Sequence, residues 1–194
     1  MSGVDVFRTG IAPEWIDYNG HLRDAYYSLI FSLATDALMD RIGLDEAYRT
    51  RTRCTLYTLE MHIHFLHEVM KTDVVDVAVR ILGSDRKRIH AAFDMRCARY
   101  PDPVSSAEMM LLHVHQGDEP KAEAFPPEVL GALAGLALAN AARGASAADT
   151  SQSQGAAGSQ SQGAAGAGVP QTASAGAPAS TIPGSRRMEL RSRS

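Results

Sequence analysis

The sequence predicts an α+β domain in which one long helix is wrapped by a curved antiparallel β-sheet. Two observations carry this prediction. Residues 22–42 place apolar side chains at helical spacing, whereas apolar and polar residues alternate along 58–65, as in a strand with one buried face. Three further strand-like segments follow, separated by short turns, so the long helix has one sheet to pack against.

The N-terminal part is expected to hold a strand and two helices. The strand lies in VFRTGI, residues 6–11, and a short second helix is expected in LDEAYRTR, residues 44–51. Gly43 is well placed to end the long helix, because glycine adopts the left-handed conformation that closes helices. The apolar positions of that helix are 22, 26, 29, 30, 33, 37, 38 and 42.

Four strands are expected in the middle of the chain. In residues 55–69, Leu59, Met61, Ile63 and Phe65 alternate with polar residues, which predicts that these four side chains face the core. The other three strands are DVVDVAVRILGSD (73–85), RKRIHAAFDMRCARY (86–100) and SSAEMMLLHVHQ (105–116). The connections are short and rich in turn residues, so we expect antiparallel hairpins.

The C-terminal part changes character near Gly144. Residues 126–143 resemble a closing helix that begins at a proline and ends before Gly144. From 144 to 194 the sequence is dominated by Ala, Gly, Ser, Gln and Pro, which cannot bury enough apolar surface to repay the entropy of ordering. We therefore expect a folded domain over 1–143 and a disordered tail over 144–194.

Composition excludes several classes of protein. The net charge is -3 and the expected folded part is mildly acidic, whereas binding to nucleic-acid phosphates needs clustered Lys and Arg, so no nucleic-acid partner is expected. The first ten residues, MSGVDVFRTG, lack the apolar core of a signal peptide, and no apolar run approaches membrane-spanning length. The expectation is a cytoplasmic protein without a membrane partner, in which Cys54 and Cys97 are free thiols.

The stretch EWIDYNGHLRDAYY, residues 14–27, concentrates polar groups before the long helix. One interpretation is structural: Asp17 or Asn19 caps the helix. The other is catalytic, because a helix N-terminus offers N–H groups that can hold an oxyanion, and Asp17 stands upstream as a base or nucleophile. Gly20 would let a ligand approach the backbone closely.

The motif Asp17-Tyr18-Asn19-Gly20-His21, followed by a long helix and four strands, resembles the hotdog-fold acyl-CoA thioesterases. The segments YTLEMHIHFL, VRILGSDRKRIHAAF and SAEMMLLHV are most similar to the betainyl-CoA thioesterases of carnitine breakdown. The resemblance covers residues 5 to about 140. It implies a single hotdog domain that hydrolyses an acyl-CoA without a cofactor or metal.

The resemblance also implies roles for single residues. Asp17 would line the active site, with Asn19 and His21 assisting, and the thioester carbonyl would meet the N-terminus of the long helix. A homodimer or homotetramer with sites between subunits is implied as well. Related motifs often carry Asn at the places held here by Arg23 and Asp24, so the roles of these two residues stay open.

Glu60 is a second candidate catalytic carboxylate. It lies with His62 and His64 on the polar face of the strongest strand, where the alternative is a solvated face. A betaine acyl group carries a quaternary ammonium, which aromatic faces bind well. The candidate substrate-binding residues are Trp15, Tyr18, Gly20, Tyr26 and Tyr57.

Arg86, Lys87 and Arg88 fall at a predicted hairpin turn, and they are candidates to bind the phosphates of CoA. The alternative for this run is a solvated turn.

Three other functions remain open. His62, His64 and Glu68 match the spacing of a cupin-like metal site. The protein could hydrolyse another short or aromatic acyl-CoA, or it could bind acyl-CoA without turnover.

Overall fold

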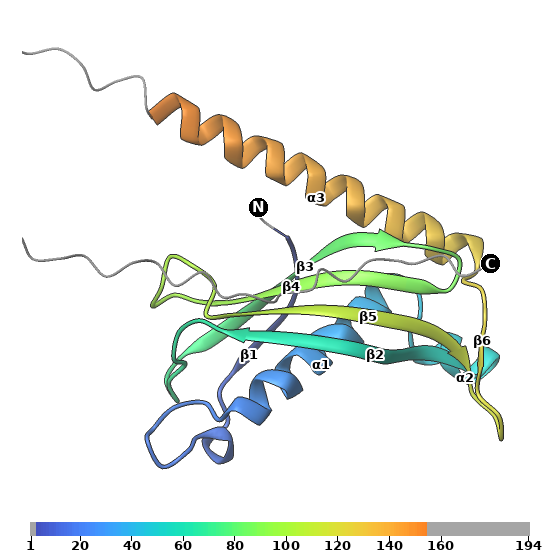
Figure 1. Cartoon of the computed structure of the whole chain (residues 1–194), viewed down its shortest axis with the longest axis horizontal. Coiled ribbons are helices and arrows are strands. Elements are labelled where there is room, and N and C mark those ends of the chain that lie inside the picture. Colours follow the sequence, from blue (N-terminus) through green and yellow to red (C-terminus); the bar gives the residue numbers. More distant parts are fainter. Residues whose placement is uncertain (1–2, 155–194) are drawn as a thin grey trace, which may run out of the picture.

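The computed structural model describes residues 3–154, and it confirms the predicted α+β class (Figure 1). The expected elements all form, most of them within a few residues of the expected bounds. In chain order they are β1 (Val4–Gly10), a short 3-10 turn (Pro13–Trp15), α1 (Asp24–Arg41), α2 (Glu46–Thr52), β2 (Cys54–Phe65), β3 (Val74–Ser84), β4 (Arg88–Cys97), β5 (Ser105–His115), β6 (Lys121–Ala122) and α3 (Pro127–Gln154). The two-residue strand β6 was not expected.

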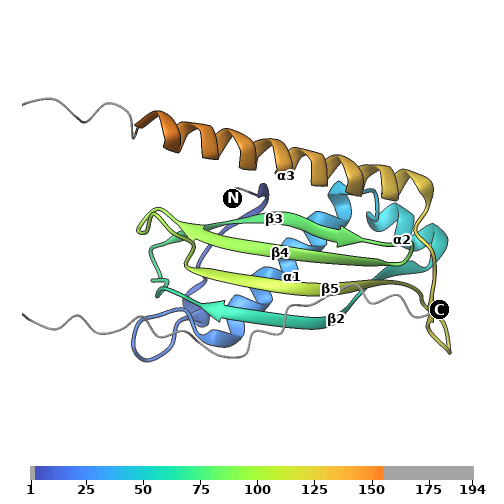
Figure 2. The ribbon, with the colours of Figure 1, turned by 45° about the horizontal axis from the view of Figure 1, so that its top comes forward.

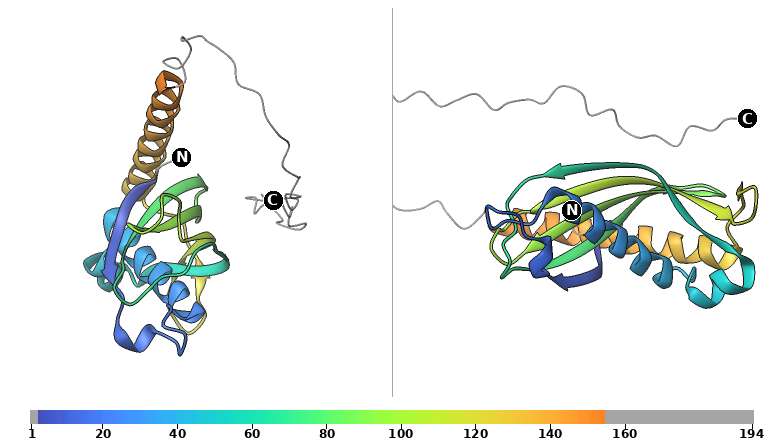
Figure 3. Two further views of the ribbon diagram at one scale, coloured as in Figure 1. Left: turned by 90° about the vertical axis from the view of Figure 1, so that its left-hand side faces the viewer. Right: turned by 90° about the horizontal axis from the view of Figure 1, so that it is seen from below.

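The sheet curls around α1, so that the helix and the inner face of the sheet bury each other's apolar side chains (Figures 1 and 3). Phe31 of α1 and Phe93 of β4 are fully buried, and their rings meet edge-on with centroids 6.4 Å apart. The buried stripe of α1 is slightly rotated from the expected one, because Leu29 is 38% exposed. Its members are Tyr27, Ile30, Phe31, Ala34, Thr35, Leu38 and Met39.

The strand order is β1-β3-β4-β5-β2, with all these neighbours antiparallel. The prediction of hairpins is confirmed for β3–β4 and β4–β5, but it is wrong for β2 and β3. Strand β2 lies at one edge of the sheet, and the chain then crosses to β3, which lies between β1 and β4. Strand β2 therefore pairs with β5 and not with β3. A two-residue alternation specifies which face of a strand is buried, but it does not specify the neighbouring strand.

Strand β2 is an edge strand in the described part of the chain, and this changes its burial. A bulge interrupts its pairing with β5 between Thr58 and Glu60. Leu59 is 52% exposed and Phe65 is 55% exposed, so the expectation that both face the core is wrong. Met61 and Ile63 are partly buried against the core, as expected.

Helix α3 lies along β3, on the other side of that strand from α1 (Figures 1 and 2). It packs through Val129, Leu133 and Leu136, which are buried. We expected the helix to end before Gly144, but it continues to Gln154. A single glycine costs a helix interior only about 1 kcal/mol, and the alanine-rich stretch that follows favours helix. The rest of the expected tail, 155–194, lies outside the described residues.

Gly43 ends α1 as expected, with a φ of 85°. Cys54 and Cys97 are both buried free thiols, as expected. Burial raises the pKa of the Cys54 thiol, which disfavours the reactive thiolate. Within residues 3–154, no helix is both long enough and apolar enough to cross a membrane.

Candidate active site

Residues 17–21 form a tight loop between two short strand-like segments, Ile16 and Leu22, which bridge each other. The Asp17 N–H donates to the His21 carbonyl (2.9 Å), and the Gly20 N–H donates to the Asp17 carbonyl (3.1 Å). Gly20 has a φ of 85°, which side chains rarely tolerate. A Cβ atom at Gly20 would meet nothing within 4 Å, so the glycine is required by the turn itself.

The Asp17 carboxylate organises this loop. Its Oδ1 accepts hydrogen bonds from the backbone N–H groups of Asn19 (2.8 Å) and His21 (3.1 Å). The bond from His21 is the main cause that lowers the pKa of Asp17, and the bond from Asn19 adds to it. Asp17 is therefore held as a carboxylate, and its Oδ2 takes no part in the two backbone bonds.

The prediction that Asp17 or Asn19 caps the long helix is wrong. The N-cap residue of α1 is Arg23, and it makes no side-chain capping bond. The helix starts at Asp24, and the Asp17 carboxylate accepts hydrogen bonds from Asn19 and His21 instead. The backbone N–H groups of Gly20 and His21 already donate to Asp17, so they are not donors for an oxyanion.

The start of α1 supplies a different donor. The Tyr26 N–H donates to the Arg23 carbonyl (2.9 Å), and the Ala25 N–H donates to the Asp24 side chain (2.8 Å). Among the described residues, none accepts a hydrogen bond from the backbone N–H of Asp24. This N–H lies at the positive end of the helix dipole, where a developing negative charge is stabilised.

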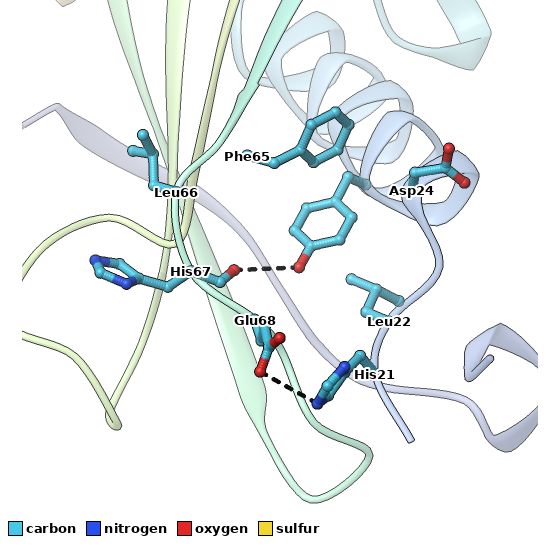
Figure 4. Close-up of a pocket in the computed structure, with 8 residues that line it drawn as sticks. His21, Leu22, Asp24, Phe65, Leu66, His67 and Glu68 are labelled. Atoms are coloured by element: carbon cyan, nitrogen blue, oxygen red, sulfur yellow. Dashed lines mark hydrogen bonds and ion pairs between the residues drawn. The ribbon is translucent and has the colours of Figure 1, made fainter. Parts of the chain in front are cut away.

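A pocket of about 280 Å³ adjoins the loop and the start of α1 (Figure 4). It lies where the loop after β2 passes the Asp17 loop, and the Leu22 N–H donates to the Val69 carbonyl at this crossing (2.7 Å). Four residues of the stretch 14–27 line it: His21, Leu22, Asp24 and Tyr27. Its lining residues are His21, Leu22, Asp24, Tyr27, Phe65, Leu66, His67 and Glu68.

His21 and Glu68 face each other across this pocket wall. The His21 Nε2 lies 3.2 Å from the Glu68 carboxylate, as Figure 4 shows. Glu68 therefore does not join His62 and His64, and His67 stacks on Tyr100 with ring centroids 4.3 Å apart. Within residues 3–154, no three His, Cys, Asp or Glu side chains gather as a metal site requires. The arrangement gives no support to the cupin-like alternative.

The aromatic candidates do not gather around one ligand-sized space. Trp15 and Tyr26 stack on each other, with centroids 5.6 Å apart and an interplanar angle of 19°. Tyr18 is 96% exposed, and Tyr57 lies on β2. None of these four lines the pocket, whereas Tyr27 and Phe65 do.

Glu60 also lies outside the pocket, on β2 opposite Met110 of β5. It is exposed, together with His62 and His64. Within one chain, Glu60 therefore belongs to the surface of the sheet's edge strand rather than to the pocket.

The turn that holds Arg86, Lys87 and Arg88 connects β3 and β4 at the opposite end of the sheet from the loop that precedes α1 (Figures 1 and 2). Asp85 accepts bonds from the Lys87 and Arg88 N–H groups and pairs with the Arg88 guanidinium at 2.6 Å. The Lys87 ammonium donates to the Ala122 carbonyl (3.1 Å). Arg86 and Lys87 are exposed on this turn.

Tyr27, Phe65 and Glu68 are among the pocket residues that the sequence did not single out for substrate binding. Tyr27 belongs to the buried stripe of a helix, and Phe65 belongs to an alternating strand. In the sequence, Glu68 was noted only because its spacing from His62 and His64 matches a cupin-like metal site. No local pattern could join these positions to His21, because their proximity depends on the crossing of two loops.

Three comparisons agree on the family. The model of the thioesterase-like superfamily matches residues 11–133. A betainyl-CoA thioesterase of Pseudomonas aeruginosa is 46% identical over 139 residues, which cover 72% of this chain and 87% of that protein. A fused L-carnitine dehydrogenase/betainyl-CoA thioesterase of Rhizobium meliloti is 35% identical over 133 residues, and these cover only 26% of the fusion protein.

Solved structures share the fold. A candidate thioesterase from Pseudomonas putida KT2440 has a TM-score of 0.62 and 36% identity, and the match covers 88% of this chain and 99% of that one. A Staphylococcus aureus protein solved in complex with CoA has a TM-score of 0.64 and 28% identity, over 71% of this chain and 86% of that one. The curled sheet around α1 is thus the hotdog fold that the sequence led us to expect, and the chain belongs to the thioesterase-like superfamily.

Proposed function

We propose that this protein hydrolyses betainyl-CoA, a short acyl-CoA thioester, to glycine betaine and free CoA. The observation that carries the proposal is the grouping of a carboxylate, a helix N-terminus and a pocket within one short stretch, Asp17 to Asp24. The 46% identity to a betainyl-CoA thioesterase supports the choice of acyl group.

The reaction needs a nucleophile and a donor for the oxyanion. In one route, Asp17 accepts a proton from water while the water oxygen bonds to the thioester carbonyl carbon. The negative charge that develops on the carbonyl oxygen is stabilised by the free N–H of Asp24 at the start of α1. The tetrahedral intermediate then breaks its C–S bond, and the proton held by Asp17 passes to the departing sulfur to give the CoA thiol. The carboxylic acid that forms releases its own proton to water.

The alternative route uses Asp17 as the nucleophile. Its Oδ2 would bond to the carbonyl carbon and expel the CoA thiolate, and water would then hydrolyse the mixed anhydride. Both routes use the same carboxylate and the same N–H donor. Asn19 and His21 assist in either route, because their N–H groups hold Asp17 in position.

We propose that a second copy of the chain binds along the outer edge of β2. Its outer edge is unpaired in the described part of the chain, and Leu59 and Phe65 are exposed along it. An apolar edge of this length is a template for pairing with another strand. We propose a homodimer or homotetramer in which Glu60 approaches the active site across the subunit boundary.

The proposed assembly also affects where the candidate CoA-binding residues Arg86, Lys87 and Arg88 act. The register puts the turn at 84–88 about 20 Å from the pocket within one chain, since some six residues of strand separate them. Antiparallel pairing of β2 with a second β2 reverses the direction of the partner's sheet. Arg86, Lys87 and Arg88 of one subunit then serve the CoA phosphates at the pocket of the other.

The remaining parts of the proposal concern residues and location. Trp15, Tyr18, Gly20, Tyr26 and Tyr57 remain proposed contacts for the acyl-CoA at the subunit boundary. We also propose that the protein acts in the cytoplasm, on a soluble substrate, without a nucleic-acid or membrane partner.

The test is thiol release from betainyl-CoA beside acetyl-, butyryl- and benzoyl-CoA, with the purified full-length protein. We expect the highest kcat/KM for betainyl-CoA. Faster turnover of another acyl-CoA would replace the substrate. Binding of CoA esters without any thiol release would favour the non-catalytic alternative.

A further inference from the structure

The pocket beside the Asp17 loop combines aromatic surface with negative charge. The rings of Tyr27 and Phe65 meet at 88° with centroids 5.2 Å apart, and Phe65 is 55% exposed, so much of its ring is open. The Glu68 side chain is 68% exposed and brings a carboxylate to the same lining. The eight described residues that line the pocket include no Lys or Arg.

The pocket offers few hydrogen-bond donors to a ligand. The Tyr27 hydroxyl donates to the His67 carbonyl (3.3 Å), and the His21 Nε2 faces Glu68 (3.2 Å), as Figure 4 shows. Leu22 and Leu66 add aliphatic surface. The pocket has few groups that could bind a negatively charged ligand. A cation with an apolar surface can contact both the apolar side chains and the carboxylate.

We infer that this pocket is the acyl subsite and that it selects an acyl group bearing a quaternary ammonium, through the rings of Tyr27 and Phe65 and the carboxylate of Glu68. The inference rests on the proposed thioesterase function. A quaternary ammonium has no N–H group, so aromatic faces and a nearby negative charge are the contacts that recognise it.

The reach of the substrate agrees with this assignment. In a betaine thioester one methylene separates the carbonyl carbon from the nitrogen, so the cation must lie next to the site of attack. Asp24 satisfies this requirement, because it carries the free N–H at the start of α1 and also lines the pocket. Trp15 and Tyr26 fit less well, since each covers one face of the other outside the pocket.

The experiment uses a neutral isostere as an internal control. 3,3-Dimethylbutyryl-CoA replaces the quaternary nitrogen with carbon and keeps the shape of the acyl group. We expect the wild-type protein to prefer betainyl-CoA in kcat/KM. Glu68→Gln and Phe65→Leu should each lower this preference about fivefold or more, because each should reduce kcat/KM for betainyl-CoA more than kcat/KM for the isostere. Phe65→Tyr keeps an aromatic face and should retain the preference.

A matched control is Glu46→Gln, which removes a carboxylate from the first turn of α2 and should leave the preference unchanged. Thermal melts of all variants report whether the fold is intact. An unchanged preference in both Glu68→Gln and Phe65→Leu overturns this inference while leaving the thioesterase proposal in place. Absence of hydrolysis of either ester by the wild-type protein overturns the thioesterase proposal, and the inference falls with it.

Discussion

The His21 imidazole and the Glu68 carboxylate lie 3.2 Å apart and join the loop before α1 to the loop after β2. The crossing is reinforced by backbone contacts, since His21 bridges Met70 and Leu22 donates to Val69. The pocket exists because these two loops meet there. The chemistry proposed for Asp17 thus depends on a segment that lies far away in the sequence.

Asp17→Asn should lower kcat for betainyl-CoA by about 100-fold or more, because the amide can neither accept a proton efficiently nor attack the carbonyl. The amide oxygen can still accept the Asn19 and His21 N–H bonds, so the loop should keep its shape. Thiol release and a thermal melt measure the two effects. Glu14→Gln, in the 3-10 turn just upstream, is the matched control. Near wild-type turnover in Asp17→Asn would rule out both proposed routes.

The acid side of the pH profile should reflect the lowered pKa of Asp17. The N–H of His21 favours the charged carboxylate, so this group stays ionised below the pH at which an ordinary Asp takes up a proton. Its contribution to stability is present above the unfolded pKa and is lost as the pH falls through the folded pKa.

We therefore expect the activity that depends on Asp17 to persist below the pH at which an ordinary Asp carboxylate takes up a proton. The measurement is kcat/KM against pH for the wild-type protein and for His21→Gln. An acid limb near pH 6 that is present in both proteins would contradict the assignment of Asp17.

The turn at 84–88 predicts a salt-dependent KM. Arg86→Ala combined with Lys87→Ala should raise KM for betainyl-CoA about fivefold at low salt, because exposed charges contribute up to about 1 kcal/mol. The double variant should also show a flatter dependence of KM on salt. Arg8→Ala, an exposed arginine on β1, is the control. If wild-type KM does not change with salt, this turn does not bind the CoA phosphates.

The exposed edge of β2 predicts assembly through this strand. Leu59→Lys should shift the protein toward monomer in sedimentation velocity, because a charge on this edge opposes pairing. Leu82→Lys on β3 is a close control: Leu82 is 46% exposed, but β4 and β5 separate β3 from the edge strand β2. Equal behaviour of the two variants would place the subunit contact elsewhere.

Local signals predicted most of the elements and some of the site. The helical period of α1 and the alternation of the strands reflect burial against a neighbouring layer, which every residue of an element senses locally. The Asp17 loop was found because its residues are contiguous, and Gly20 and Asp17 interact within five residues. The wrong predictions concern features for which several alternative interactions were available to the same residues. They are the capping of α1, the position of β2 and the end of α3.

The sequence by itself determined the α+β class, the long helix, the strands and the contiguous motif from Asp17 to His21, because these depend on short-range spacing. The tertiary structure alone decided that β2 pairs with β5 and that Glu68 and Phe65 complete the pocket. Those relationships require segments distant in the chain to come together, and only the packing of the sheet around α1 brings them into contact.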